Sequence, residues 1–165
     1  MPKINAAAIP ADRPYGGYKL SQVRRAGGDE TIRFDAVLCH EGRPLAHVSN
    51  GGEGGAHRYQ PIDADGWADL AAFNAYTAGW NAQSEFAGLG DADQLINRLL
   101  MVATLNRARS LPFLLDGEDY WQTGEHSTFR GATAAQVLET LRSPAYAARN
   151  PRVWSRGVGD FVAVI

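Results

Sequence analysis

Apolar and polar residues alternate in several short runs between residues 18 and 60. Over Thr31–His40, four apolar side chains fall on one face of an extended chain and two charged ones on the other: Ile32, Phe34, Ala36 and Leu38 against Arg33 and Asp35. This period of two is typical of a half-buried strand. Comparable runs occupy residues 18–25, 45–50 and 57–60. Turns that contain Gly or Pro separate the runs at 18–25, 31–40 and 45–50 from one another. Short turns between such strands predict an antiparallel meander.

After Pro61 the apolar residues take on helical spacing. The first predicted helix spans residues 66–82, and one stripe along it holds four side chains: Leu70, Phe73, Thr77 and Trp80. Asp65 stands at the N-cap position, where a carboxylate can accept a hydrogen bond from a free backbone N–H. Asp69 lies in the first turn, near the positive end of the helix dipole. The pattern therefore predicts a helix that is capped by Asp65.

A second helix follows after a short loop. Asp91 and Gln94 have the spacing of a capping box in which Asp replaces Ser or Thr. The following turns are apolar on most sides, and the helix ends near the basic residues Arg107 and Arg109. We expect this helix to be the most buried one.

The C-terminal part predicts one more helix and two short strands. Thr133 and Gln136 form a regular capping box, which opens a helix that runs through Leu141. Residues 113–115 and 161–165 are apolar runs of strand length.

These elements predict an α+β fold in which an antiparallel meander sheet is packed on one face by two or three helices. The sequence contains no internal repeat and no linker long enough to separate two domains. We expect a single domain over residues 18–165, preceded by an irregular, Pro- and Ala-rich arm over residues 1–17.

Composition and charge exclude several classes of protein. The chain has 165 residues, with 16 Lys plus Arg against 18 Asp plus Glu, for a formal net charge of −2. This balance argues against general nucleic-acid binding, which usually requires a basic excess. A single cysteine, Cys39, excludes an internal disulfide and a cysteine-based zinc site. The sequence shows no signal peptide and no membrane-spanning apolar run, so we expect a cytoplasmic protein with no membrane partner.

The most unusual segment is the glycine-rich loop, residues 50–57, in which four glycines surround one glutamate. Glycine freedom lets backbone N–H groups approach an anion, or lets the backbone of a partner come close. The loop lacks the Gly-Lys-Ser/Thr ending of a P-loop, and no helix follows it directly as in a dinucleotide fingerprint. The alternative interpretation is a hairpin turn that requires positive φ. The candidate binding residues here are Asn50, Gly51, Gly52, Glu53, Gly54, Gly55, His57, Arg58 and Tyr59.

Metal-binding and catalytic patterns are weak. Three histidines share the first half of the chain with Glu53: His40, His47 and His57. Their spacings fit no metal motif. A catalytic dyad would need His57 or His126 beside a nucleophile, but Cys39 sits in an apolar strand, where a thiol is usually inert. We therefore predict no catalytic residue, no metal ligand and no cofactor.

An acidic and aromatic segment lies further along the chain. The carboxylates within residues 116–119 can bind a divalent cation, but their spacing is not that of an EF-hand. The alternative is a solvated turn flanked by packing aromatics. Trp and Arg are enriched at protein interfaces, so Trp121, Arg152 and Trp154 complete the candidate binding residues.

The order of these features resembles that of uncharacterised small proteins of bacteria and their phages. The shared pattern is a short meander, a loop like that over residues 49–55, a helix with aromatic residues, and the 113–115 strand before a capped helix. It covers residues 30–143. Those families carry no assigned activity, so the resemblance implies only a class: accessory factors of mobile elements, including inhibitors that bind host defence machinery.

The leading hypothesis is a non-enzymatic interaction protein that binds a protein or nucleoprotein partner through the glycine-rich loop and nearby aromatic and Arg residues. The alternative is a small nucleotide- or phosphate-binding protein or hydrolase. In that alternative the loop cradles a phosphate, and Glu53, His47, His57 or Arg58 supplies the chemistry. It requires these side chains to converge on one pocket.

Overall fold

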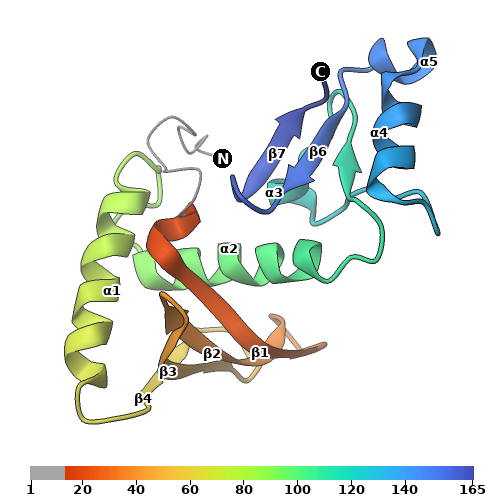
Figure 1. Cartoon of the computed structure of the whole chain (residues 1–165). Helices are drawn as coiled ribbons and strands as arrows, with labels where there is room; N and C mark the ends of the chain where they lie inside the picture. Colours follow the sequence, from red (N-terminus) through yellow and green to blue (C-terminus); the bar gives the residue numbers. More distant parts are fainter. Residues whose placement is uncertain (1–13) are drawn as a thin grey trace. The chain divides into compact units, whose positions relative to one another are not determined.

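Four strands form the predicted antiparallel meander (Figure 1). The computed structural model describes residues 14–165. The strands pair in the order β1-β2-β3-β4, and their bounds are β1 (Tyr18–Ala26), β2 (Arg33–His40), β3 (Arg43–Asn50) and β4 (Arg58–Pro61). A 3₁₀ turn at Pro14–Gly17 precedes β1, and the rest of the predicted arm, residues 1–13, lies outside the described residues.

The two faces of this sheet differ in burial. Phe34, Ala36 and Leu38 of β2 are buried in the hydrophobic core, as the alternation predicts, and we call this side the core face. The opposite side, which we call the open face, is exposed at Arg33 and Asp35, but Val37 and Cys39 at the other end of β2 are buried on it. The predicted burial of Ile32 on the core face is wrong, since 48% of this residue is exposed. The reason is that β2 begins at Arg33, so Ile32 belongs to the preceding turn.

Two helices, α1 (Gly66–Asn81) and α2 (Asp91–Asn106), pack on the core face of the meander. The buried residues of α1 confirm most of the predicted stripe: Leu70, Phe73 and Thr77, together with Gly66 and Asn81. The second helix adds four leucine and isoleucine side chains to the same core: Leu95, Ile96, Leu99 and Leu100. Each such side chain contributes about 1.5–3 kcal/mol when it leaves water. The α+β prediction, with an antiparallel meander covered on one face by helices, is confirmed.

The caps of α1 and α2 differ from the predicted ones. Asp65 occupies the N-cap position, but its side chain makes no capping bond. Its φ of −83° and ψ of −10° are helical, whereas a side-chain cap requires an extended residue. Asp91 lies inside α2, and its Oδ1 accepts hydrogen bonds from Asn81 Nδ2 at 2.8 Å and Gly88 N at 2.9 Å. Asp91 therefore fastens the loop between the two helices instead of capping the second one.

The described chain divides into two compact units, Tyr15–Ala103 and Thr104–Ile165, which we call the N-terminal and C-terminal units. The C-terminal unit has a sheet of its own, in the order β5-β6-β7: β5 (Phe113–Leu114), β6 (Arg152–Ser155) and β7 (Asp160–Ala163). The apolar runs predicted the first and last of these strands. They missed β6, because it is only four residues long and begins and ends with polar side chains.

Three helices belong to the C-terminal unit: α3 (Tyr120–Thr123), α4 (Ala134–Arg142) and α5 (Pro144–Ala147). The predicted capping box at the start of α4 is confirmed, since Gln136 N donates to Thr133 Oγ1 and Thr133 N donates to Gln136 Oε1. Val137 and Leu141 of α4 pack with Phe113 and Val153 of the small sheet. Within residues 14–165, no helix combines the length and the apolar character that crossing a membrane requires.

Candidate functional site

The glycine-rich loop is organised around the buried side chain of Asn50, at the end of β3. Its Oδ1 accepts hydrogen bonds from Gly52 N at 2.8 Å and Thr31 Oγ1 at 3.3 Å. Its Nδ2 donates to Gly55 O at 3.3 Å and to His57 Nδ1 at 3.0 Å. Only 5% of Asn50 is exposed. One amide side chain thus holds both ends of the loop.

The near side of the loop rests on the turn between β1 and β2. Gly52 O accepts hydrogen bonds from the backbone N–H groups of Glu30 and Thr31, at 2.9 and 3.2 Å. Gly28 and Gly52 lie so close that a Cβ built on Gly52 would stand 2.7 Å from Gly28 Cα. The Arg33 side chain donates from Nε to Gly51 O at 3.0 Å. The close approach of Gly28 and Gly52 leaves no room for a side chain at either glycine.

The far side of the loop is held by α2. His57 N donates to Asp93 Oδ2 at 2.9 Å, and Tyr59 OH donates to Asp93 Oδ1 at 2.6 Å. The His57 ring bridges Asn50 Nδ2 and Asn97 Oδ1, which matches a neutral ring with its hydrogen on Nε2. Gly52, Gly54 and Gly55 adopt φ between +80° and +85° across this span. The glycines therefore serve a turn that requires positive φ.

The candidate residues at this loop differ in their exposure. Gly51, Glu53, Gly55 and Arg58 are exposed, whereas Asn50 and Gly52 are buried. The loop and the first residue of β4 thus present to solvent a short edge with one carboxylate, that of Glu53, and one guanidinium, that of Arg58.

The histidines do not come together. His57 and Tyr59 share the core face, but His47 alternates with the buried Ala46 and Val48, and therefore lies on the open face. His40 donates from Nε2 to Gly16 O at 3.0 Å and stacks on the Tyr18 ring. Among residues 14–165, no three His, Cys, Asp or Glu side chains are grouped so that they could hold a metal ion. The joint role of His47 and His57 that a hydrolase would need has no geometric basis.

The candidates of the C-terminal unit are parts of a packed aromatic cluster. Trp121 and Trp154 lie 6.1 Å apart, centroid to centroid, and both contact the Phe161 ring. Their indole N–H groups donate to Asp160 Oδ1 and to Asn106 Oδ1 respectively. Trp154 is only 5% exposed. Both indoles pack against the small sheet; Trp154 is buried there, whereas Trp121 keeps an intermediate exposure.

The acidic segment around residues 116–119 makes local bonds. Glu118 Oε2 accepts from Leu115 N, and Asp119 caps α3 by accepting from Trp121 N. Arg152 donates from Nη2 to Glu118 O at 2.7 Å. Burial lowers the pKa of the neighbouring His126. The segment is thus a turn flanked by packed aromatics.

No family model, no curated protein and no solved structure matches this chain.

A surface outside the predicted set presents the most exposed tryptophan of the described chain. Trp67, in the first turn of α1, is 70% exposed, and Ile62 just before the helix is 43% exposed. Asp63 and Asp65 between them are also exposed. We call these four residues the Trp67 surface. Trp67 lies outside the stripe of α1 residues that the sequence predicts to be buried, and this position could have indicated its exposure. The many Ala residues of α1 make the edges of that stripe hard to recognise.

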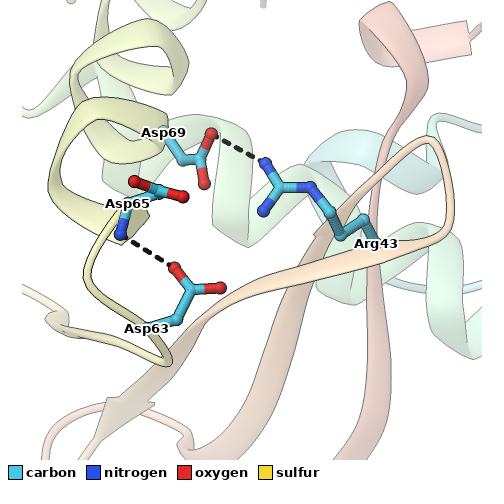
Figure 2. Close-up of polar contacts among 4 residues, drawn as sticks. All are labelled: Arg43, Asp63, Asp65 and Asp69. Carbon is cyan, nitrogen blue, oxygen red and sulfur yellow. Dashed lines mark hydrogen bonds and ion pairs between the residues drawn. The ribbon is translucent and has the colours of Figure 1, made fainter.

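The backbone beneath the Trp67 surface is held in one arrangement. Ile62 N donates to Leu45 O of β3, and Asp65 N donates to Asp63 Oδ1 at 3.1 Å (Figure 2). Gly66 packs so closely on Pro61 that an added Cβ would lie 2.5 Å from the Pro61 Cβ. The surface follows β4 directly, at the end of the strand opposite to the glycine-rich loop.

Alkaline pH offers a test of the Tyr59 contact. Burial, followed by the hydrogen bond to Asp93, raises the pKa of Tyr59 above its ordinary value of 10.0. The folded state therefore keeps a proton that the unfolded chain releases, and the resulting stability is present below pH 10 and lost as pH rises beyond it. We expect the free energy of unfolding to fall between about pH 10 and about pH 11, and to fall less steeply in Tyr59→Phe.

The measurement is urea denaturation across this range for both proteins. Burial also raises the pKa of Tyr18 and Tyr76, so part of the slope will persist in Tyr59→Phe. If the free energy of unfolding falls equally steeply with pH in both proteins, the raised pKa of Tyr59 is contradicted.

Proposed function

We propose that this chain is a non-enzymatic interaction protein that binds a protein or nucleoprotein partner through the Trp67 surface. The observation that supports the proposal is the exposure of Trp67, a large apolar side chain that contributes little to its own core. Tryptophan is enriched among the few residues that supply most of the binding energy at protein interfaces. The two other indoles considered above, Trp121 and Trp154, are engaged in packing.

The position of the surface also suits docking. A preformed backbone lowers the entropy cost of binding, and the bonds around Ile62 and Asp65 provide such a frame. The proposed contact therefore moves from the glycine-rich loop to the opposite end of β4. Glu53 of the loop and Arg58 at the start of β4 remain a second candidate contact in the same unit. The resemblance to accessory proteins of bacteria and phages makes bacterial defence machinery the first partner class to examine.

The test is affinity capture from a bacterial lysate, with mass spectrometry, for the native chain and for Trp67→Ala. We expect recovery of a specific partner to fall about tenfold or more in the variant, because removing an interface tryptophan costs roughly 2 kcal/mol or more. Leu89→Ala is the matched control, since Leu89 is 71% exposed in the loop between α1 and α2. Equal recovery with all three proteins would refute this role of Trp67.

A further inference from the structure

A line of polar side chains crosses the open face of the meander from β1 to β4. Its four members are partners in the strand register: Arg24, Asp35, Ser49 and Arg58. Residues directly opposite one another in paired strands project from the same side of a sheet, and Asp35 lies on the open face, so all four do. Neighbouring strands are about 4.8 Å apart, which places the Cα atoms of Arg24 and Arg58 about 14 Å from each other. We call these residues the cross-strand row.

A β-bulge in β1 brings Arg24 into this row. Between the Ser21 and Arg24 pairs, β1 contains one residue more than β2. Gln22, with a φ of +51°, lies in this irregular part of the strand. In an unbulged strand Val23 would lie opposite Asp35 on the open face, and Arg24 would turn to the core face. With the bulge, Val23 is buried in the core and Arg24 is exposed, which is the re-aiming of side chains that bulges produce.

The open face is more basic than the chain as a whole. Its paired positions in β1–β4 carry four cations, Lys19, Arg24, Arg33 and Arg58, and one carboxylate, that of Asp35. The formal charge of this face is therefore +3, whereas that of the whole chain is −2. All four cations are exposed. Within residues 14–165 none of them makes an ion pair, and this includes Arg24 with its register partner Asp35.

The acidic residues nearest to this face lie beyond the strand ends. Glu30 belongs to the turn between β1 and β2, and Glu53 belongs to the glycine-rich loop. Glu30 Oε2 lies against Gly54, since a Cβ built on that glycine would stand 2.5 Å from it. The guanidinium groups of the cross-strand row thus have no carboxylate partner within the described chain.

Carboxylates on an extended protein segment match the spacing of the row. A guanidinium group forms two parallel, charge-assisted hydrogen bonds with a carboxylate. In an extended segment, residues i and i+4 project from the same side and are about 13–14 Å apart, which is the separation of Arg24 and Arg58. Residue i+2 then faces Asp35 and Ser49, where a hydroxyl group can donate to the carboxylate.

A nucleic acid fits this face less well. The paired positions of the open face hold no Phe, Tyr or Trp on which bases could stack. Asp35, in the middle of the row, repels a phosphate, and the net charge of −2 opposes the approach of a polyanion. The observations therefore favour an acidic protein segment.

We propose that the open face binds an extended protein segment with two acidic residues four positions apart. One carboxylate pairs with Arg24 and the other with Arg58, while the residue midway between them meets Asp35 and Ser49. This contact lies on the side of the sheet opposite to the one that α1 covers. It is therefore a second interaction surface, separate from the Trp67 surface, and it goes beyond the proposed function.

The probe is acetyl-Glu-Thr-Ser-Thr-Glu-amide, whose two carboxylates are four residues apart. Its isomer acetyl-Glu-Thr-Ser-Glu-Thr-amide has the same composition, but the spacing of three puts the carboxylates on opposite sides of an extended chain. A third peptide has Gln in place of both Glu. The readout is the backbone amide resonances of Asp35 and Ser49 in a nitrogen-15 correlation spectrum. We expect saturable shifts with the first peptide, binding about threefold or more weaker with the isomer, and none with the Gln peptide.

Charge removal tests the two guanidinium groups. In the double variant Arg24→Gln and Arg58→Gln, we expect the first peptide to bind about fivefold or more weakly. Both side chains are exposed, so the fold should be unaffected. The matched control is Arg130→Gln with Arg149→Gln, which makes the same charge change at exposed positions of the C-terminal unit and should leave the affinity unchanged. Raising the salt from about 50 mM to about 500 mM should also weaken binding.

Several results would overturn the inference. They are equal binding of the three peptides, no shift with the first peptide at millimolar concentration, or an unchanged affinity in the double Gln variant. Larger shifts with pentathymidylate than with the first peptide would assign the face to nucleic acid, and shifts with protein concentration alone would assign it to a second copy of this chain. Trp67→Ala should bind the peptide as the native chain does, so a failure of this inference and a failure of the proposed function are separately detectable.

Discussion

Replacing Gly52 by Ala is expected to lower the free energy of unfolding by about 2–5 kcal/mol. Its φ of +82° is a left-handed conformation, which costs a residue with a Cβ roughly 1–2 kcal/mol. The added methyl would also stand 2.7 Å from Gly28 Cα, a backbone atom that cannot rotate away, and such overpacking costs about 1–3 kcal/mol more. Urea denaturation measures the loss, as a shift in midpoint at an unchanged slope.

Gly51→Ala is the matched control for this prediction. No heavy atom lies within 4 Å of a Cβ built on Gly51, and its φ is not positive. We expect a change within about 0.5 kcal/mol. Hydrogen exchange of the Glu30 and Thr31 amides, which donate to Gly52 O, should accelerate in Gly52→Ala alone. Equal stability of the two variants would show that the Gly28–Gly52 contact is not required.

Asn50→Ala should have a similarly large effect, about 2–4 kcal/mol of unfolding free energy. The substitution removes two acceptor and two donor contacts from a buried position. It leaves Gly52 N and His57 Nδ1 without their partners, and each unsatisfied buried group costs roughly 1–3 kcal/mol. The loop should then lose the bonds that hold Gly52 and Gly55 to the end of β3, although the strands themselves stay paired.

Two comparisons make the Asn50 experiment specific. Asn74→Ala removes an exposed amide from α1, so we expect no loss of stability there, because Ala is the better helix former. Asn50→Asp keeps both acceptor contacts but places a carboxylate against Gly55 O, so it should be nearly as damaging as Ala. A stable, natively folded Asn50→Ala protein would contradict the central role of this side chain.

The expected instability of Gly52→Ala also affects how the function is tested. Removing loop glycines to probe binding would disturb the fold first, because Gly52 and Gly28 form the contact that seats the loop. Gly51→Ala leaves that seat intact, so it is the better probe of the exposed loop edge. Trp67→Ala is better still, since Trp67 is largely outside the core.

Local patterns along the sequence determined most of the secondary structure. The period-two alternation around Phe34 predicted a strand, and the stripe of Leu70, Phe73 and Thr77 predicted the buried side of α1. The pair Thr133 and Gln136 predicted the start of α4 to the residue. These predictions succeed because the interactions involved join residues a few positions apart, so their geometry follows from the local backbone period. The capping predictions for Asp65 and Asp91 are wrong for two different reasons. Asp65 adopts a helical φ and ψ, and Asp91 Oδ1 accepts its hydrogen bonds from Asn81 and Gly88 in the preceding helix and loop.

The tertiary structure decided where the chemistry lies. Strand register placed His47 and His57 on opposite faces of one sheet, which no spacing along the chain could show. Packing buried Trp154 and left Trp67 exposed, although each has a charged residue two positions away on both sides in the sequence. Burial of a side chain depends on which distant elements cover it. The sequence by itself offered a positive-φ turn as one of two interpretations of residues 50–57, and only the fold showed that this turn is present and is seated between Gly28 and α2.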